Sequence, residues 1–355
     1  MYDNINFKSR CALTTFECSK CVTLYSLIEI QKIQPNGTTV IEWQSDASKK
    51  MLPQYAGIGI KIKHDKNNVL RLQIEMSLHK YWNQRCNGLH LHNYNRFTMT
   101  DAKQAYQTLR NEFLTIGIDI QDFTVSNYEL SVNLELDAHT TPEMIMCAAQ
   151  SSAGKEIIQA RNYDIHKLYG THCTKDFRKV TVFYDKAHEV KQKNKKQKIN
   201  GNTDVPQNLL RCELKYQNKD MRHNKTDLSV LFTDAHIAKV TKRFLDDFYN
   251  KLVFAPPQYR PPKYDKNGHL DDAYLTALVY SYYDLTTDVM NENKHLQDCK
   301  DLARLQVRKH LDSRKDKERF DRKIKALPLQ PPPKRTEIET MYRILVSTEL
   351  GITIK

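Results

Sequence analysis

Three glutamates lie in the middle of strand-like segments whose residues alternate between apolar and polar types. Glu75, Glu129 and Glu213 each fall on the polar side, and Glu135 shares the side of Glu129. Acids from separate strands that converge on one sheet face can hold a divalent cation. Mg²⁺ and Mn²⁺ prefer oxygen ligands and keep waters, so two or three carboxylates suffice. A solvent-exposed antiparallel face gives the same alternation, and that interpretation stays open.

Tyr184 is a candidate nucleophile because it ends a strand-like segment and is followed by Lys186 two residues later. A free phenol has a pKa near about 10, so attack on a phosphate near neutral pH needs a nearby metal or ammonium group. The chain has 19 tyrosines, and an ordinary core tyrosine is the alternative. Tyr184 is in phase with the apolar Val180 and Val182. Turning it towards the carboxylates therefore requires a β-bulge or a strand end.

His90 and His92 form a second candidate metal pair, because two histidines at positions i and i+2 share one face of a strand. They lie in residues 87–95, which are rich in Asn and Gly and are typical of a loop. A site built on these two histidines is therefore an alternative to the carboxylates.

The segments around these residues predict an α+β fold, with an antiparallel sheet core, flanking helices and a helical C-terminal region. Thr98 or Thr100 can cap a helix that ends near Gly117. Residues 191–203 are polar and basic and are expected to form a flexible loop. The expected strands are residues 57–63, 70–78, 123–136, 179–184 and 209–216.

The pattern becomes helical after residue 225. We expect a catalytic domain in residues 1–225 and a helical DNA-binding or accessory region in residues 226–355. Within that region, residues 237–252 have helical apolar spacing and residues 337–349 are a last short helix. Residues 300–325 contain 11 Lys or Arg against 5 Asp or Glu and are a candidate duplex-binding surface.

The overall charge of +13, from 55 Lys and Arg against 42 Asp and Glu, indicates a polyanionic partner such as nucleic acid. With 10 Gly and 12 Pro, the 355-residue chain is neither collagen-like nor of low complexity. No run of about 18 apolar residues predicts a membrane span. The first residues show no signal-peptide pattern, and the eight cysteines fit reduced thiols in a cytosol.

In their order, these segments resemble the rolling-circle replication initiators of the filamentous-phage gene II type and, more loosely, plasmid initiators. The resemblance extends over about residues 71–216, and the residues after 225 have no counterpart in it. It departs from the family at Asn127 and Glu129, where the family usually has Arg and Asp. The matching segments are 72–80 (LQIEMSLHK), 87–93 (NGLHLHN), the helix at 100–113, 125–129 (VSNYE), 183–189 (FYDKAHE) and 210–213 (LRCE).

The resemblance implies a site-specific nicking and joining enzyme that starts rolling-circle replication. Tyr184 would attack the scissile phosphate and form a 5′-phosphotyrosyl link, with Lys186, Arg211 and Lys80 on phosphate oxygens. Glu129, Glu75 and Glu213 would hold Mg²⁺ or Mn²⁺. The implied partners are supercoiled double-stranded origin DNA, single-stranded DNA and a host helicase and polymerase, without a membrane, in the cytoplasm of a bacterial host. The alternatives are a non-enzymatic DNA-binding initiator and a nickase whose metal is held by His90 and His92.

Overall fold

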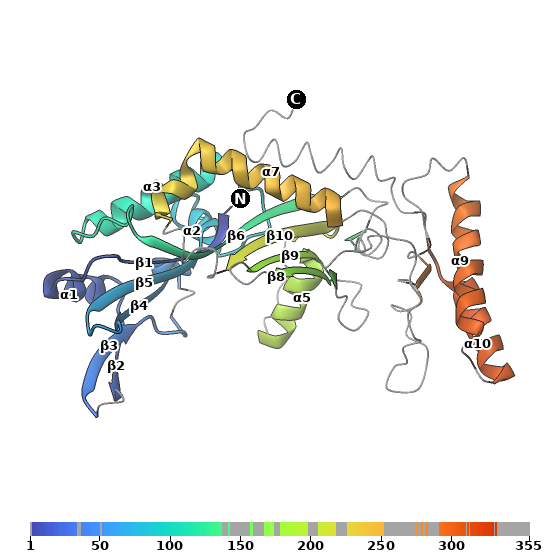
Figure 1. Cartoon of the computed structure of the whole chain (residues 1–355), viewed down its shortest axis with the longest axis horizontal. Coiled ribbons are helices and arrows are strands. Elements are labelled where there is room, and N and C mark those ends of the chain that lie inside the picture. The colour runs from blue at the N-terminus through green and yellow to red at the C-terminus, as the bar shows by residue number, and fades with distance from the viewer. Residues whose placement is uncertain are drawn as a thin grey trace.

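The computed structural model has an α+β architecture, with one twisted antiparallel sheet, flanking helices and a helical pair near the C-terminal end (Figure 1). This confirms the fold class expected from the sequence. None of the described helices is both long and apolar enough to span a membrane. The structure describes residues 2–33, 37–49, 52–136, 141–142, 157–158, 167–173, 178–197, 205–217, 226–251, 275, 278–279, 282, 291–309, 311, 313–329 and 331.

Ten strands of the described chain form the sheet, in the order β2-β3-β4-β5-β1-β6-β10-β9-β8-β7. The N-terminal strand β1 pairs with β5 on one side and β6 on the other, so it joins the two halves of the sheet. The strands are β1 (Tyr2–Lys8), β2 (Ile28–Ile33), β3 (Thr39–Gln44), β4 (Gly59–His64), β5 (Leu70–Ser77), β6 (Thr124–Glu135), β7 (Ile157–Ile158), β8 (Lys167–Cys173), β9 (Arg178–Asp185) and β10 (Leu209–Gln217).

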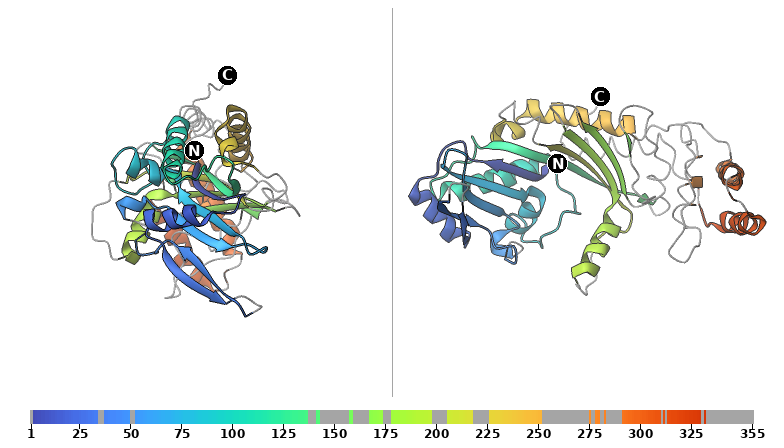
Figure 2. Two further views of the ribbon diagram at one scale, coloured as in Figure 1. Left: turned by 90° about the vertical axis from the view of Figure 1, so that its left-hand side faces the viewer. Right: turned by 60° about the horizontal axis from the view of Figure 1, so that its bottom comes forward.

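Helices α3 and α7 lie over one face of the sheet, whereas α5 extends from the opposite side (Figures 1 and 2). Ile237, Val240 and Phe244 of α7 belong to the same buried core as the apolar side chains of β6 and β10. The domain boundary expected near residue 225 stays a prediction. The described helices are α1 (Thr15–Leu24), α2 (Leu78–Arg85), α3 (Met99–Leu114), α5 (Lys186–Gln197), α7 (Asp234–Lys251), α9 (Glu292–Arg308) and α10 (Arg314–Ala326).

Local sequence signals explain where α3 begins and ends. The Thr98 side chain accepts a hydrogen bond from the backbone N–H of Asp101, and the Asp101 carboxylate accepts one from the backbone of Thr98. This reciprocal capping satisfies two N–H groups that the first helical turn leaves without partners. Gly117, with φ of +87°, follows the helix end in the left-handed region that glycine tolerates.

The prediction of a flexible loop at residues 191–203 is wrong for residues 191–197, because helix α5 continues to Gln197. The Asp185 carboxylate accepts a hydrogen bond from the backbone N–H of His188, as an N-cap does. Glu189 then pairs with Lys186 three residues before it and with Lys193 four residues after it. Such pairs stabilise a polar, lysine-rich helix that lacks an apolar stripe. Residues 198–203, like 337–349, lie outside the described part of the chain.

Candidate metal and catalytic site

The polar face of β10 carries Arg211, Glu213 and Lys215 at every second position. In the antiparallel pairing with β6, Lys215 lies opposite Glu129 and Glu213 lies opposite Ser131. Residues that lie opposite each other in a sheet point to the same face, so the two glutamates converge there. The register of β6 and β10 is therefore what brings Glu129 and Glu213 together, as the alternation in sequence predicts.

Tyr184 points to this same face without any bulge. The register of β9 against β10 is continuous, with Tyr184 opposite Arg211 and Val182 opposite Glu213. The expectation that a bulge or a strand end must turn Tyr184 is therefore wrong, since the pairing continues to Asp185 and the valine side of β9 is itself the carboxylate side. Both faces of β9 are covered here, because Val182, Phe183 and Tyr184 are all buried.

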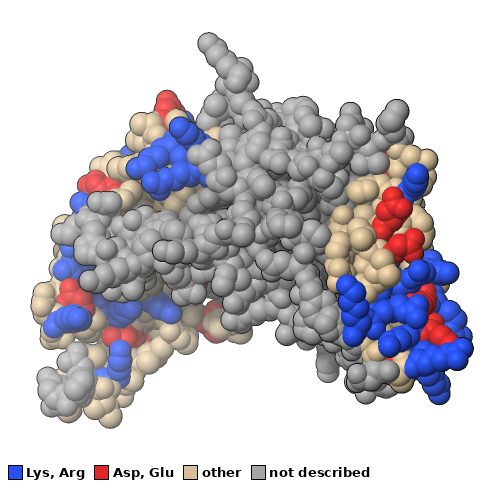
Figure 3. Space-filling model, turned by 45° about the vertical axis from the view of Figure 1, so that its right-hand side comes forward, with Lys and Arg blue, Asp and Glu red and all other residues tan. Residues whose placement is uncertain are grey.

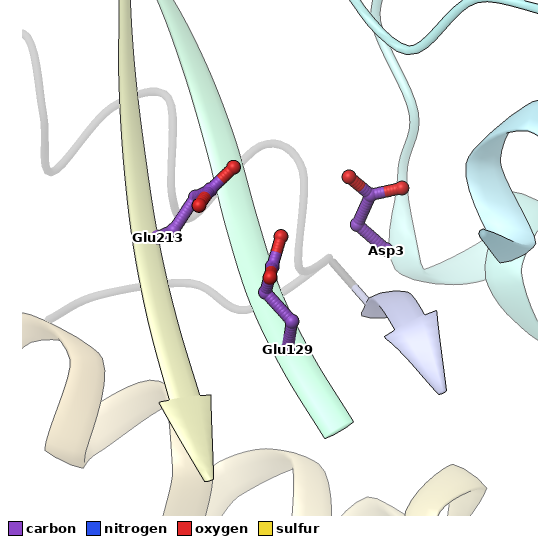
Figure 4. A group of neighbouring side chains, drawn as sticks. All are labelled: Asp3, Glu129 and Glu213. Atoms are coloured by element: carbon purple, nitrogen blue, oxygen red, sulfur yellow. The ribbon is translucent and has the colours of Figure 1, made fainter. Parts of the chain in front are cut away.

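A third carboxylate, that of Asp3, comes from β1. Between Tyr2 and Ile5 the pairing of β1 with β6 shifts by one residue, so Asp3 and Asn4 together face Glu129. Carboxylate oxygens of Asp3, Glu129 and Glu213 lie within 4.8 Å of one another, and all three residues are buried. Figure 4 shows the three side chains pointing toward one another from three neighbouring strands. This acidic group could hold a divalent ion, because all its donors are oxygens.

The expected third ligand, Glu75, is not part of this group. It lies on β5 opposite Asn6 of β1, and its side chain is exposed. The residue of β5 that reaches the group is Ser77, whose hydroxyl donates to Asp3. Asp3 was not among the candidates from the sequence. The polar pair Asp3–Asn4, which interrupts the apolar alternation of Tyr2, Ile5 and Phe7, is the signal that could have revealed it.

The two histidines of the alternative site are not in any carboxylate, histidine and cysteine cluster of the described residues. The His92 ring stacks on Tyr94 with 4.1 Å between ring centroids. Its Nδ1 lies 3.3 Å from the amide nitrogen of Asn83. Burial lowers the pKa of His92, and the neighbouring His90 adds to this effect. The histidine segment forms part of the loop against α2, and Asn93 within it donates to Asp3 at 2.8 Å.

Arg211 is the central cation of the site. It is 0% exposed, and each of its five N–H donors has an acceptor. The acceptors are Glu213 Oε1 at 2.8 Å, the Asn93 carbonyl at 2.7 Å, Asn133 Oδ1 at 3.1 Å, Ser131 Oγ at 2.9 Å, and Asp3. In this conformation the guanidinium holds the carboxylates in place, and its role as a phosphate contact stays a prediction.

A second cation, the Lys215 ammonium, lies 2.8 Å from Oε2 of Glu129 and 2.8 Å from Oε2 of Glu213. Burial and the charges of Glu213 and Asp3 raise the pKa of Glu129 to about 7. Burial acts in the same direction on Glu213, but Arg211 and Lys215 outweigh it and lower the pKa of Glu213 to about 2. Two adjacent acids with such different environments favour one ionised carboxylate and one that gains a proton more easily.

Tyr184 and Lys186 flank this acidic group. The Tyr184 hydroxyl donates to Glu213 Oε1 at 2.6 Å, and the residue is 6% exposed. Burial raises the pKa of Tyr184 well above its ordinary value, although Arg211 acts in the opposite direction. The Lys186 ammonium lies 2.7 Å from Glu189, and burial together with Arg211 lowers the pKa of Lys186 to about 8. The structure thus brings together a phenol, three carboxylates, the cations Arg211 and Lys215 on one sheet face, and the buried Lys186 at the start of α5.

Comparison with known proteins finds no family model and no curated protein that matches the chain. Among solved structures, one match is a rolling-circle replication initiator protein from Geobacillus stearothermophilus. That match covers 78% of this chain and 93% of the other, at 13% sequence identity and a TM-score of 0.33. A likeness at this level says nothing about catalytic residues, so the functional assignment depends on the side chains themselves.

Basic side chains gather on the helical pair α9–α10, which stands at one end of the molecule in Figure 1. Helix α10 carries seven Lys or Arg against three acids, and most of its basic side chains are exposed. Its Phe320 and Ile324 are buried, as are Cys299 and Val307 of α9, so one side of each helix is covered. Figure 3 shows dense Lys and Arg on this side of the molecule. The arrangement suits a phosphate backbone.

Proposed function

We propose that this protein is a metal-dependent DNA nickase that starts rolling-circle replication through a 5′-phosphotyrosine at Tyr184. The observation that carries the proposal is the hydrogen bond from the Tyr184 hydroxyl to Glu213, a member of the buried acidic group. A phenol beside an oxygen-only metal site and a buried arginine is an arrangement suited to phosphoryl transfer. The ordered resemblance of residues 71–216 to phage and plasmid initiators supports the same assignment.

The donors in the site fit Mg²⁺ or Mn²⁺, since they are carboxylates from Asp3, Glu129 and Glu213. Oε1 of Glu213 is engaged by Tyr184 and Arg211, and the Asp3 oxygens by Arg211, Ser77 and Asn93. Oε2 of Glu129 and of Glu213 each contact the partly exposed Lys215 ammonium, and these oxygens would hold the cation once that ammonium moves away. When bound, the ion would polarise the scissile phosphate and offset the charge that develops on it.

Within this proposal, the Tyr184 oxygen forms a bond to phosphorus as the bond from phosphorus to the 3′ oxygen breaks. The buried phenol is neutral, so its proton leaves during attack, and Glu213 Oε1 is placed to accept it. The released 3′ oxygen takes up a proton from water and becomes the 3′-OH for a polymerase, and Glu213 returns the phenol proton to water, so the step is balanced. Because Tyr184 is only 6% exposed, DNA reaches the phenol after the side chains that cover it shift.

Lys186 and Lys80 are proposed phosphate contacts, and Arg211 is proposed to position Asp3 and Glu213. The partners in this proposal are supercoiled origin DNA, the single strand that nicking releases, and a host helicase and polymerase in the bacterial cytoplasm. The net charge of +13 and the basic helix α10 support a DNA partner.

The test is a cleavage assay on supercoiled plasmids that carry candidate origins, with Mg²⁺, Mn²⁺ or a chelator. We expect open circles that carry covalently bound protein only when metal is present, and a phosphotyrosine at residue 184 in mass spectrometry of the adduct. Salt-dependent DNA binding without cleavage under any metal would contradict the enzyme and support the non-enzymatic initiator.

The alkaline side of the nicking rate is expected to follow Lys186. Its pKa is lowered to about 8, so the ammonium loses its proton, and with it the charge available to a phosphate, as the pH rises through 8. We expect the rate to fall there in the wild type. In Lys186→Arg the charge persists, so the fall should move to higher pH, whatever the absolute rate. Initial rates between about pH 6.5 and 9.5 measure this.

The control is Lys193→Arg, because Lys193 also pairs with Glu189 but is 62% exposed. Its pH profile should match that of the wild type. If the nicking rate of Lys186→Arg falls at the same alkaline pH as that of the wild type, a group other than Lys186 controls this fall.

A further inference from the structure

The two glutamates of the acidic group share one cation, the Lys215 ammonium. Oε1 of Glu213 accepts from Tyr184 and Arg211, and Oε1 of Glu129 accepts from the Asn4 amide at 3.2 Å. The other oxygen of each glutamate, Oε2, lies 2.8 Å from the Lys215 ammonium. Lys215 therefore bridges the two carboxylate oxygens that a divalent ion would bridge.

Lys215 differs from Arg211 in how easily it can leave. The Arg211 side chain is 0% exposed, whereas the Lys215 side chain is 34% exposed. A lysine stem is flexible and can carry its ammonium out to water, while withdrawal of Arg211 would break five hydrogen bonds at once. Of Arg211 and Lys215, the two cations that contact these carboxylates, Lys215 is the one that can move away at a low cost in free energy.

The charges of the site favour the exchange. When Glu129 is ionised, the three carboxylates of Asp3, Glu129 and Glu213 against the two cations Arg211 and Lys215 leave one negative charge. The neighbouring Lys186 is neutralised by Glu189. Withdrawal of Lys215 leaves two negative charges, which a divalent ion neutralises. Without a metal, the same lysine limits the repulsion between buried acids, which would otherwise be costly.

We propose that Lys215 is an internal competitor of the metal: its ammonium fills the space between Glu129 and Glu213 until a divalent ion displaces it. This inference rests on the metal site of the proposed function. It assigns Lys215 the role of setting the metal affinity. It also implies that the cation bound by Glu129 and Glu213 differs between the metal-free and the metal-bound protein.

The test is a titration of the full chain with Mn²⁺, followed by the paramagnetic resonance of the free ion and by calorimetry. Lys215→Met keeps the length of the stem but removes the charge, so we expect its Kd for Mn²⁺ to fall about tenfold or more relative to wild type. Without metal, this variant should melt at a lower temperature than wild type, and Mn²⁺ should restore much of the loss.

Two further variants complete the design. Lys215→Arg keeps a cation and holds it in a two-pronged geometry, so Mn²⁺ should bind more weakly than in wild type. Lys103→Met removes a lysine that pairs with Asp234 at 2.8 Å outside the site, and its Kd should not change.

If Lys215→Met binds Mn²⁺ no more tightly than wild type does, the role of Lys215 is overturned. If the wild type nevertheless binds Mn²⁺ and Glu129→Gln abolishes that binding, the metal site itself is supported. Failure of wild type and Lys215→Met alike to bind Mn²⁺ would overturn both the inference and the metal of the proposed function.

Discussion

Tyr184→Phe is expected to abolish covalent adduct formation while the protein still binds DNA and folds. The substitution removes one oxygen, the atom proposed to attack phosphorus. Loss of a covalent nucleophile lowers kcat by on the order of 10⁶ in a serine protease, so residual nicking should fall below detection. The lost hydrogen bond to Glu213 should cost about 1–3 kcal/mol in the free energy of unfolding, because its acceptor is ionised.

Tyr81→Phe is the matched control for this experiment. The Tyr81 hydroxyl donates to Glu112 Oε2 at 2.8 Å, and the residue is 0% exposed, so the same atom and the same kind of bond are lost elsewhere. Its nicking rate should equal that of wild type in the supercoiled-plasmid assay with Mn²⁺. If Tyr184→Phe forms the adduct as fast as Tyr81→Phe does, the nucleophile is a different residue.

The alternation of residue types predicted much of the sheet and two of its three clustered carboxylates. In β6 and β10 one face is apolar and the other polar, so a period of two places Glu129 and Glu213 on one side. The expected strands at residues 70–78, 123–136 and 209–216 match β5, β6 and β10 closely. Where one face of a strand is apolar and the other polar, pattern alone locates the polar side chains, even though both faces are buried here.

Two features of the site depend on tertiary register, which local pattern does not contain. A single extra residue in β1 turns Asp3 towards Glu129, and one inserted residue reverses the phase of everything before it. In β9, Val182 and Phe183 point to opposite faces and both are buried, so alternation could not show which face Tyr184 shares. Only the pairing of Tyr184 with Arg211 settles this.

Arg211→Met is expected to produce the largest loss of stability of any single substitution in the site. It leaves the carboxylates of Asp3 and Glu213 buried without their main counter-charge, whereas the Asn93 carbonyl keeps its hydrogen bond from the Asn133 amide. Breaking a buried ion pair by removing one partner costs about 3–5 kcal/mol. Urea unfolding at pH 7 measures the difference in free energy, and the variant should also lose Mn²⁺ binding if the site no longer forms.

The deficit of Arg211→Met is its loss in the free energy of unfolding relative to wild type. The pH dependence of this deficit shows whether its cause is electrostatic or is a loss of packing. Burial would raise the pKa of Asp3 and Glu213, but their polar and charged neighbours, with Arg211 the largest contributor, lower both, that of Glu213 to about 2. Carboxylates with lowered pKa stabilise the folded state above their unfolded pKa values, near about 4, and this contribution disappears as the pH falls through the folded values. The deficit of Arg211→Met should therefore shrink below about pH 4, where the carboxylates of the variant are protonated.

Arg110→Met is the control for charge and size. Arg110 makes two carboxylate bonds as well, both of them to Asp119, at 2.8 and 2.6 Å, but it lies on the surface with 27% of its side chain exposed. Its loss should change the free energy of unfolding little, because water solvates the carboxylate left behind. A deficit of Arg211→Met that is equally large at pH 7 and pH 3 would mean that packing around the guanidinium stabilises this face of the sheet. In that case neutralisation of Asp3 and Glu213 would not be its main contribution.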